Sequence, residues 1–584
     1  MKNIPNFWPF LVEYHHNDVF LHAKPNDQMK IRLILTLSLA FLAAGIASAQ
    51  SESDHNFEVK KNLDVFNSIY KNLDLIYVDT LDANEVIGTG IKAMLKSLDP
   101  YTEYYPEENM KDLKEIYTGK FAGIGSLIRY NMKIKRVVID EPYEGMPADL
   151  AGLKKGDIIL SIDDSVMTDK DVSYVSSHLR GDPGTSFMLK ILRPSTGKKM
   201  QMKITRKTVQ TPSVPFYGLR KDGIGYINLR QFTDECAQEV RNAFIEMKDK
   251  GMKGLVLDLR NNGGGSENEA VQIVNMFVPK GKLIVSNRGK LKRSNIDYIT
   301  KVEPIDTVMP VVVLVGDMTA SASEITSGAL QDLDRAVIVG TRTYGKGLVQ
   351  TSVDLPYNGS LKLTSNKYYI PSGRCIQAIN YKHARGGYTE HIPDSLTKVF
   401  YTAKGREVRD GGGIMPDVEV QPDSLSNISY YLASSGADST EVMLDYEVDY
   451  INRHASIAPA ADFEISDEEY EDFKQRVLKS GFKYDPESEK YLKQLEKLAK
   501  FEGYYEDAKE EFDNLKKKLT HNLSKDLDIN KEQIKKILAS DIVAAYYYQR
   551  GTVENSLRGD KQMEKACQLI TERTEYNKIL RIDN

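Results

Sequence analysis

The chain has few of the residues that build disulfide frameworks or metal sites. Only three cysteines occur in 584 residues, Cys236, Cys375 and Cys567, and they lie far apart without C-x-x-C spacing. No H-E-x-x-H pattern is present, so neither a disulfide scaffold nor a zinc site is predicted. The 78 basic and 83 acidic residues are interleaved, with a formal charge of −5. This charge pattern gives no reason to expect nucleic-acid binding.

The apolar run near the N-terminus is too short to cross a bilayer. After Met29-Lys30-Ile31-Arg32 it extends for about 14 residues, whereas a spanning helix needs roughly 18 to 20. Ala47-Ser48-Ala49 then precedes Gln50, which completes the pattern of a secretory signal. We expect cleavage near Ala49 and a protein of the periplasm or cell envelope, with a membrane anchor as the alternative. Residues 1–28 are better explained by a misassigned start codon than by a function.

Histidine is missing between His178 and His383. A serine nucleophile in this part of the chain therefore has no local imidazole as its base. The serine-rich segment Thr319-Ala320-Ser321-Ala322-Ser323-Glu324 nevertheless precedes Tyr344-Gly345-Lys346-Gly347. Burial lowers the pKa of a lysine by several units, so Lys346 is expected to act as the base for Ser321.

The length predicts several domains, because one hydrophobic core does not usually extend over so many residues. Apolar residues recur every three or four positions up to about residue 117, as in amphipathic helices, and short β-type runs begin at Phe121. Strand-like and helix-like runs then alternate to about Val420, which is typical of a layered α/β domain. The rest of the chain is predicted to be helical, with a capping-box pattern at Ser466-Asp467-Glu468-Glu469.

We therefore expect a multidomain α+β protein. Its expected parts are an N-terminal segment with the signal (1–49), a helical domain (50–118), a β-rich module (119–208), an α/β core (209–420) and a mainly helical C-terminal extension (421–584). The charged helix faces of the extension are expected to be solvated, with a docking or assembly surface as the alternative.

The β-rich module resembles a PDZ domain. The resemblance rests on Phe121-Ala122-Gly123-Ile124-Gly125, Met146-Pro147-Ala148, Ala151-Gly152-Leu153, Gly156-Asp157 and Arg180-Gly181-Asp182-Pro183-Gly184-Thr185. Backbone N–H groups at Gly123, Ile124 and Gly125 are expected to hold a terminal carboxylate, while the next strand edge pairs with the peptide. The alternative for these glycines is an ordinary tight turn. Arg180 is expected either to couple tail binding to opening of the enzyme or to serve the structure only.

Ser321 is expected at a strand-to-helix junction, where unpaired N–H groups occur. The N–H of Ala322 is the first candidate oxyanion donor. A second is expected from Gly264 or Gly265 in Asn261-Asn262-Gly263-Gly264-Gly265, unless these glycines serve only the turn. The Gln350 amide is expected to orient the Lys346 amine, with an exposed or structural glutamine as the alternative.

A phosphate-binding loop is a rival interpretation of the lysine segment. Gly340 to Gly347 follows G-x-x-x-x-G-K-[ST] except at the last position. That pattern opens a helix, whereas Leu348–Val353 has the composition of a strand. Nucleotide binding is therefore not expected.

Together with Gly413-Ile414-Met415-Pro416-Asp417-Val418, these motifs resemble the carboxyl-terminal processing peptidases, the tail-specific proteases of family S41. The resemblance covers roughly residues 56–420. It implies an α/β core of the ClpP and crotonase type, with Ser321 as nucleophile, Lys346 as general base and Gln350 in support. It also implies an oxyanion hole from Ala322 and a glycine of the Gly-rich turn, and a PDZ domain that recognises the substrate's C-terminal tail and gates the active site.

The sequence departs from that family at three places. Tyr101 and Thr102 stand where histidine and serine are usual, Thr319 replaces the first serine of the serine-rich turn, and Gly263 replaces a common proline. None is expected to touch the nucleophile or the base.

We therefore expect an exported serine endopeptidase that binds apolar C-terminal tails of proteins and needs no metal or cofactor. An adaptor protein or self-association is a further possibility for its partners. The alternative functions are a catalytically silent PDZ adaptor and crotonase-like acyl chemistry, which also uses a glycine-rich oxyanion turn.

Overall fold

The computed structural model describes residues 54–378, 392–434 and 436–582. The expected export signal lies outside these residues. The chain divides into two units, Met1–Ile91 and Lys92–Asn584. In the first unit, residues 54–76 are helical, and α2 (Ala83–Lys96) begins there and runs past its end. The expected domain bounds stay a prediction.

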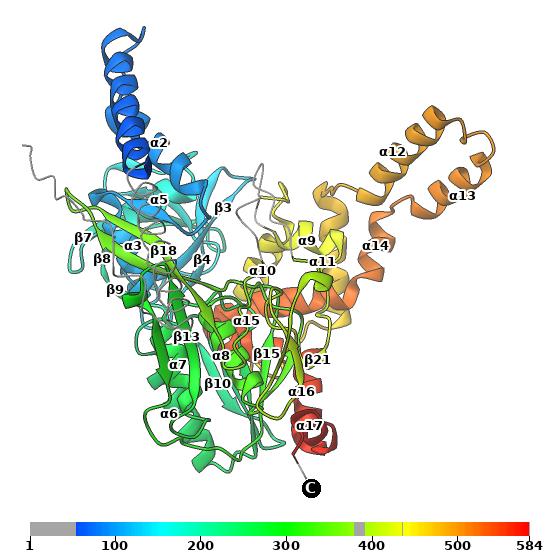
Figure 1. Cartoon of the computed structure of the whole chain (residues 1–584). Helices are drawn as coiled ribbons and strands as arrows, with labels where there is room; N and C mark the ends of the chain where they lie inside the picture. Colours follow the sequence, from blue (N-terminus) through cyan, green and yellow to red (C-terminus); the bar gives the residue numbers. More distant parts are fainter. Residues whose placement is uncertain (1–53, 379–391, 435, 583–584) are drawn as a thin grey trace, which may run out of the picture. The chain divides into compact units, whose positions relative to one another are not determined.

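A six-stranded sheet forms the centre of the second unit (Figure 1). Its order is β10-β11-β12-β15-β16-β21, and all neighbours are parallel except β10 and β11. The strands are β10 (Phe216–Leu219), β11 (Ile224–Asn228), β12 (Gly254–Asp258), β15 (Val311–Val315), β16 (Val337–Gly340) and β21 (Val418–Glu419).

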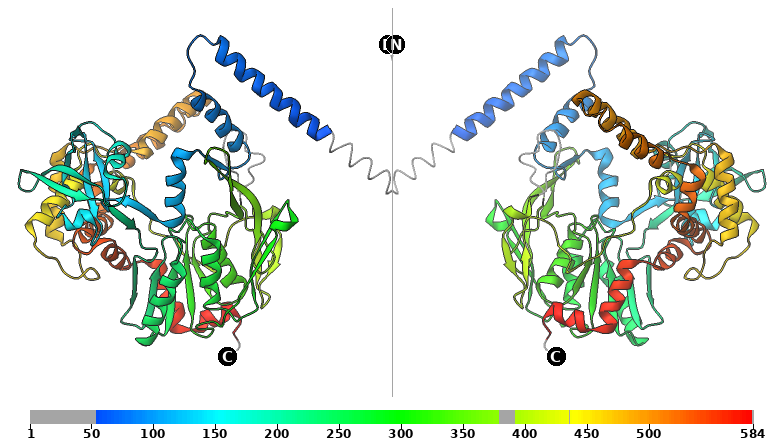
Figure 2. Two further views of the ribbon diagram at one scale, coloured as in Figure 1. Left: turned by 90° about the vertical axis from the view of Figure 1, so that its left-hand side faces the viewer. Right: turned by 90° about the vertical axis from the view of Figure 1, so that its right-hand side faces the viewer.

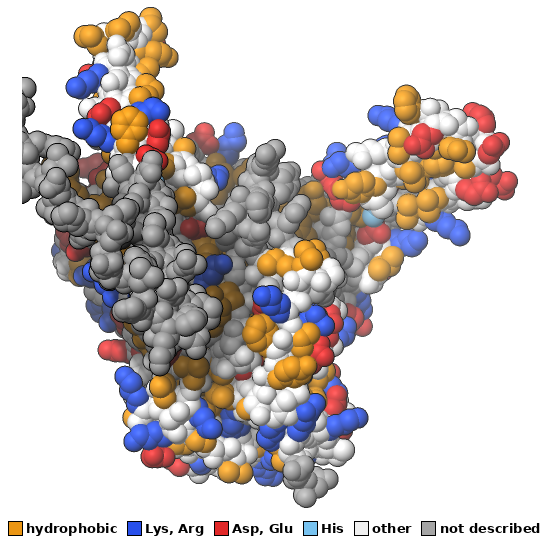
Figure 3. Space-filling model, in the orientation of Figure 1, with side chains coloured by type: hydrophobic (Ala, Val, Ile, Leu, Met, Phe, Trp, Pro, Cys, Tyr) orange, Lys and Arg blue, Asp and Glu red, His pale blue; other side chains and the backbone are white. Residues whose placement is uncertain are grey.

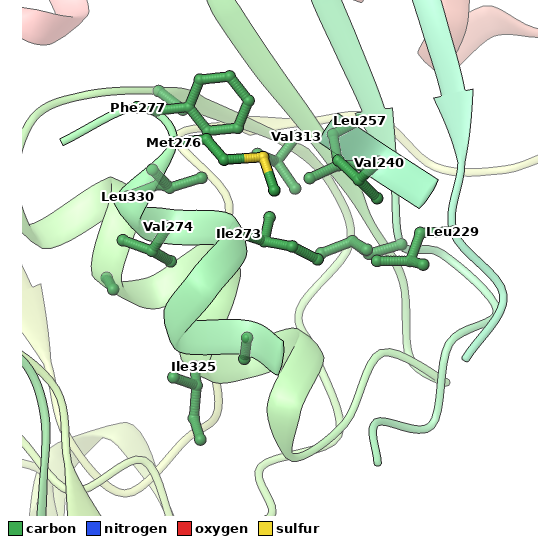
Figure 4. Close-up of a cluster of buried hydrophobic side chains, with 14 of the residues drawn as sticks. Leu229, Val240, Leu257, Ile273, Val274, Met276, Phe277, Val313, Ile325 and Leu330 are labelled. Carbon is green, nitrogen blue, oxygen red and sulfur yellow. The ribbon is translucent and has the colours of Figure 1, made fainter. Parts of the chain in front are cut away.

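Helices cover both faces of this sheet, which explains the continuous apolar sequence Val311–Val315. Side chains alternate across a strand, so Val313 and Val312 face opposite sides. Val313 joins the cluster with α6 (Cys236–Asp249), α7 (Glu267–Asn275) and α8 (Ala322–Asp332), shown in Figure 4.

The end of the chain supplies the cover of the opposite face. Val312 and Leu314 pack there against Met563 and Ile570 of α16 (Lys561–Glu572) and against α17 (Thr574–Leu580). These red helices lie beside the sheet in both views of Figure 2. Part of the expected C-terminal extension thus completes the hydrophobic core of the α/β domain.

A second sheet, of five strands, includes the strand that follows Lys346. Its order is β1-β18-β13-β14, and β17 also pairs with β18. The strands are β1 (Glu103–Tyr105), β13 (Leu283–Gly289), β14 (Ile296–Ile299), β17 (Leu348–Asp354) and β18 (Ser360–Tyr369), with β19 (Val399–Tyr401) and β20 (Glu407–Arg409) forming a separate hairpin. Leu348–Val353 is therefore a strand, as the sequence predicted.

The PDZ-like module is a sheet in the order β3-β4-β5-β7-β8, with β6 beside β5. α3 (Met110–Thr118) leads into it, and the pair β2–β9 brackets it. The remaining bounds are β2 (Lys120–Gly123), β3 (Ser126–Asn131), β4 (Arg136–Pro142), α4 (Pro147–Leu150), β5 (Ile158–Ile162), β6 (Ser165–Val166), α5 (Val172–Leu179), β7 (Ser186–Arg193), β8 (Lys198–Thr205) and β9 (Lys207–Gln210).

A C-terminal helical domain follows the α/β core. Its apolar cluster joins α9 (Asn427–Ala433), α10 (Val442–Arg453), α11 (Asp467–Ser480), α14 (Leu523–Ile529) and α15 (Lys531–Ser556). The hairpin of α12 (Glu487–Glu502) and α13 (Lys509–Leu519) exposes hydrophobic side chains (Figure 3). Phe501 of α12 is the most exposed of them, at 88 %. The expected multidomain fold class is confirmed, with helical, PDZ-like, α/β and C-terminal helical parts.

Buried charges join the PDZ-like module to α10. Lys155 Nζ lies 3.2 Å from Glu447 Oε2 and 3.3 Å from Asp140 Oδ1. Burial by itself lowers the pKa of Lys155, but these carboxylates outweigh it and raise that pKa. Arg129 also pairs with Glu441 at 2.6 Å. Such paired buried charges favour one docking geometry, since a shift would leave them unpaired.

Replacement of Ile570 tests the role of α16 as a cover of the sheet. Ile570 is 4 % exposed, and its side chain occupies the space beside Gly254 on β12. Ile570→Ala should lower the free energy of unfolding by about 2–5 kcal/mol, because it leaves a cavity. The measurement is chemical denaturation beside Ile529→Ala, whose side chain is 67 % exposed. Equal effects of the two substitutions would contradict this role of α16.

Candidate active site

Ser321 lies at the junction between the β15 loop and α8, as expected from the sequence. Its backbone has φ 57° and ψ −116°, a conformation that non-glycine residues rarely adopt. Ser321 is partly exposed, although every residue of α8 is buried. A strained turn of this kind exposes the serine side chain, as in the nucleophile elbows of hydrolases.

The Gly-rich bend at residues 261–265 is hydrogen-bonded to the serine turn at residues 319–324. The carbonyl of Asn262 accepts from Ala320 N at 3.1 Å and from Ser323 Oγ at 2.9 Å. Gly264 has φ 100°, and a Cβ there would lie 2.8 Å from Ser321 Cβ. Only glycine allows this close approach of the two turns.

Glu324 connects the serine turn to the lysine loop. Its Oε2 accepts from the backbone N–H of both Ser321 and Lys346, each at 2.9 Å. Its Oε1 accepts from Gly345 N at 2.7 Å and from Thr343 Oγ1 at 2.5 Å. Burial raises the pKa of Glu324 to about 6 although all four hydrogen bonds act in the opposite direction. One carboxylate thus fixes the backbones of both proposed catalytic residues.

Lys346 lies in the loop before β17, largely out of water. Burial, together with the nearby charge of Lys362, lowers the pKa of Lys346 to about 8. The carboxylates of Glu324, Asp99 and Glu103 act in the opposite direction but do not compensate. Part of the population therefore carries a neutral amine near neutral pH.

The ring of Tyr101 covers this amine. Lys346 Nζ lies 4.3 Å from the ring centroid, and the Tyr101 hydroxyl donates to that of Tyr344 at 3.4 Å. The expectation that Tyr101 lies away from the base was therefore wrong. The chain places the segment before β1 at the lysine because β1 pairs with β18, which also pairs with β17.

Gln350 lies on β17, and its amide donates to Thr364 Oγ1 at 3.2 Å. No hydrogen bond joins Gln350 to Lys346 in the part of the chain that the structure describes. Thr364 Oγ1 donates in turn to Asp99 Oδ1 at 3.2 Å. Direct orientation of the lysine by Gln350 stays a prediction.

The candidate oxyanion donors differ in availability. The N–H of Gly264 already donates to Asn262 Oδ1 at 2.9 Å. The N–H groups of Ala322 and Gly265 donate to no protein group among the described residues. The backbone N of Ala322 lies close to Gly264, since a Cβ added to Gly264 would be 3.0 Å from that nitrogen. Because the N–H of Gly264 already has an acceptor, Ala322 and Gly265 are the better candidates for oxyanion donors.

The glycine loop of the PDZ-like module lies between β2 and β3. The carbonyls of Ile124 and Gly125 accept from Ala148 N and Tyr143 N, whereas their own N–H groups donate to no described protein group. Gly125 has φ 68°, and a Cβ there would lie 2.5 Å from Met146 Cβ. β3 is the edge strand of its sheet and α5 lies beside it.

Arg180 follows α5 and connects the module to α3. Its Nη1 donates to Glu115 Oε2 at 2.5 Å, and its Cζ lies 4.8 Å from the centroid of Phe121. A Cβ on Gly123 would also meet the Arg180 side chain at 3.8 Å. The structure thus places Arg180 beside the glycine loop and in contact with α3, the helix between β1 and β2.

The sequence interpretation assigned no role to Glu324 or Tyr101. A signal for Glu324 was available, because Ser321-x-x-Glu324 follows the same capping-box pattern as Ser466-x-x-Glu469. No local signal existed for Tyr101, since its contact depends on strand pairing. Thr319, a departure from the family pattern, donates to Leu259 O at 2.7 Å and so fastens the serine turn to β12.

Neither a membrane-crossing helix nor a metal-binding cluster is found in residues 54–378, 392–434 and 436–582. No helix in those ranges is long and apolar enough to cross a membrane. No group of three or more His, Cys, Asp or Glu side chains there could hold a metal ion.

Three parts of the chain match known families. Residues 138–193 match "PDZ domain", residues 223–384 match "Peptidase family S41", and residues 428–570 match "Probable PDZ-protease, C-terminal helical domain". The fold and site therefore define a PDZ-containing peptidase.

Several proteases are similar to more than half of the chain. The chain is 36% identical over 355 residues to the "Carboxy-terminal-processing protease" of Bartonella bacilliformis, covering 60% of this chain and 80% of that protein. It is 32% identical over 362 residues to a "Probable CtpA-like serine protease" of Staphylococcus aureus, covering 61% and 70%. The solved "photosystem II D1 C-terminal processing protease" is 28% identical, covers 61% of this chain and 86% of its own, and gives a TM-score of 0.34. The chain belongs to peptidase family S41, among the carboxy-terminal-processing serine proteases.

Replacement of Glu324 tests whether its carboxylate positions the site. Glu324→Gln should lower kcat on the order of 10- to 100-fold, because one amide cannot accept all four hydrogen bonds and small displacements are costly in catalysis. The lost charge should also lower the pKa of Lys346, so the remaining activity should reach its half-maximum at a lower pH.

Glu469→Gln is the matched control, since it removes the same kind of cap from α11. Each substitution should cost about 0.5–2 kcal/mol of stability. Wild-type kcat in Glu324→Gln, or equal losses of activity in both variants, would contradict the positioning role.

Proposed function

We propose that the protein is a serine endopeptidase in which Ser321 is the nucleophile and Lys346 the general base. The observation that carries the proposal is the carboxylate of Glu324, which binds the backbone N–H of both residues. The strained backbone of Ser321 and the lowered pKa of Lys346 support the two roles separately.

In this mechanism the neutral Lys346 Nζ accepts the proton of Ser321 Oγ as that oxygen bonds to the substrate carbonyl carbon. The tetrahedral intermediate then loses its C–N bond, and the Lys346 ammonium returns the proton to the leaving amine. A water molecule, deprotonated by Lys346, attacks the acyl-enzyme ester. The carboxylic acid product leaves, and Ser321 regains its proton from Lys346.

The negative charge of the intermediate develops on the former carbonyl oxygen. We assign its stabilisation to the N–H of Ala322 at the start of α8 and to that of Gly265. Both are without a protein acceptor in the described ranges, whereas Gly264 serves better as the residue that lets the two turns approach.

The PDZ domain would select substrates by their C-terminal tails. The N–H groups of Ile124 and Gly125, which donate to no described protein group, suit a terminal carboxylate. The edge of β3 beside α5, which pairs with no other described strand on that side, suits an added strand. Proteins with apolar C-terminal tails are therefore the proposed substrates. The sequence pattern of residues 29–49 supports an encounter in the periplasm or cell envelope.

Tail-dependent cleavage tests the whole proposal. A protein with a short apolar C-terminal tail should be cleaved by the wild type and more slowly when the tail is charged. Ser321→Ala and Lys346→Ala should each abolish turnover, because no other group takes over the lost role, while binding of the tail survives. The measurement is product formation together with tail binding.

Ser327→Ala is the control, since this serine lies deeper in α8 and donates to Ser323 O. Wild-type cleavage by Ser321→Ala or Lys346→Ala would refute the assignment. Binding without cleavage by the wild type would favour a silent PDZ adaptor, and turnover of acyl thioesters would favour crotonase-like chemistry.

Arg180 is proposed to couple tail binding to catalysis through Glu115. Arg180→Ala and Glu115→Ala should both change the activation by apolar tails, by about 2- to 10-fold, since each breaks the link between the PDZ domain and α3. The measurement is the ratio of cleavage rates with apolar and charged tails. If neither substitution moves this ratio, or if the double variant shows independent effects, Arg180 has no part in coupling.

A further inference from the structure

The loop before β1 has a defined conformation fixed by Asp99. Asp99 Oδ1 accepts from the backbone N–H of Tyr101 and Thr102, each at 2.8 Å, and Oδ2 accepts from Thr102 Oγ1 at 2.9 Å. Asp99 and Thr102 are both buried. A side chain that bonds its own following backbone in this way sets the direction of the chain, and hence of the Tyr101 side chain.

The same loop is fastened to β18. Thr364 Oγ1 donates to Asp99 Oδ1, and Thr364 N donates to Thr102 Oγ1, both at 3.2 Å. The pairing of β1 with β18 continues the attachment from Glu103 opposite Lys362. Gln350 donates to the same Thr364 hydroxyl. Gln350 is therefore connected to the loop that carries Tyr101.

The Tyr101 ring lies over the Lys346 amine with 4.3 Å between Nζ and the ring centroid. A lysine has a flexible four-carbon stem and loses rotamer entropy when it is held in one place. An aromatic face both attracts the ammonium form and excludes water from one side of it. The ring is thus placed to fix the amine and to dehydrate it.

We propose that Tyr101 is a positioning residue for the general base, whose ring holds the Lys346 amine in place and shields it from water. The Asp99, Thr364 and Gln350 hydrogen bonds keep the ring there. This inference rests on the proposed role of Lys346 as the base. It also gives Gln350 an indirect function through Thr364 rather than a contact with the lysine.

The charges around the amine set the direction of the expected effect. Lys362 on β18 disfavours the ammonium form, whereas Glu324 on α8, Asp99 in the loop and Glu103 on β1 favour it. Desolvation is the largest cause of the lowered pKa. Removal of the ring admits water, so the pKa of Lys346 should rise toward its ordinary value of 10.5 despite the lost attraction to the ring.

The experiment compares Tyr101→Phe and Tyr101→Ala in the full chain. Tyr101→Phe keeps the ring and should retain kcat within about twofold. Tyr101→Ala should move the rising limb of the pH–kcat profile up by about one unit, which is a roughly tenfold loss at pH 7 that recovers at higher pH. KM should change little, because the ring acts on the base.

A second readout is independent of activity. Competitive labelling of Lys346 with a trace of acetic anhydride at several pH values, followed by mass spectrometry, reports the pKa of the amine itself. Tyr101→Ala should raise this labelling pKa by the same amount, and Tyr101→Phe should not. If Lys346→Ala remained active, the proposed function would fail, while the labelling would still test the contact with Tyr101.

Two further variants serve as a control and as a test of the hydrogen bonds behind Tyr101. Tyr105→Ala is the control, because it removes another tyrosine ring from the same segment. The hydroxyl of Tyr105 donates to Glu103. Thr364→Val removes the hydroxyl between Gln350 and Asp99 and should shift the profile in the same direction by a smaller amount. An unchanged labelling pKa in Tyr101→Ala, or a loss of activity that is equal at every pH, would overturn the proposal.

Discussion

The site depends on the buried carboxylate of Glu324. A charged group without contact with water is tolerated only where its oxygens are satisfied, and here four donors converge on it. Two of these donors belong to Ser321 and Lys346, which come from different elements. If either the Ser321 or the Lys346 backbone moved away, an oxygen of the Glu324 carboxylate would lose a hydrogen bond. The buried charge therefore stabilises the observed relative position of the two residues.

The sheet behind the site requires the far end of the chain. β12 and β15 are apolar on both faces, so the fold needs helices from both sides. α16 supplies one cover, and its first turn also reaches the Gly-rich bend, where Arg260 binds Asp258 on β12 and Asp560 at 2.6 Å. The C-terminal helices therefore stabilise β12, the strand that precedes the Gly-rich bend in contact with the Ser321 turn, rather than forming an appendage.

The surroundings of Lys346 show how opposing effects are balanced. Three carboxylates raise its pKa, yet burial and Lys362 lower that pKa to about 8. The ring of Tyr101 belongs to the lowering side because it replaces water. The segment with Tyr101 precedes the α/β core in the sequence, and the pairing of β1 with β18 brings it to Lys346. Strand pairing thus completes the environment of the proposed base.

The amino-acid sequence alone predicted the order of the helical, PDZ-like, α/β and C-terminal helical parts, the strand after Lys346 and the place of Ser321 at a strand-to-helix junction. These features follow from local periodicity and turn chemistry, which neighbouring residues carry. The contact of Glu324 with the Lys346 loop, the positions of Tyr101 and Thr364 and the cover by α16 emerge only in the tertiary structure. Each depends on contacts between segments far apart in the chain, and the pairing and packing that create such contacts leave no local pattern.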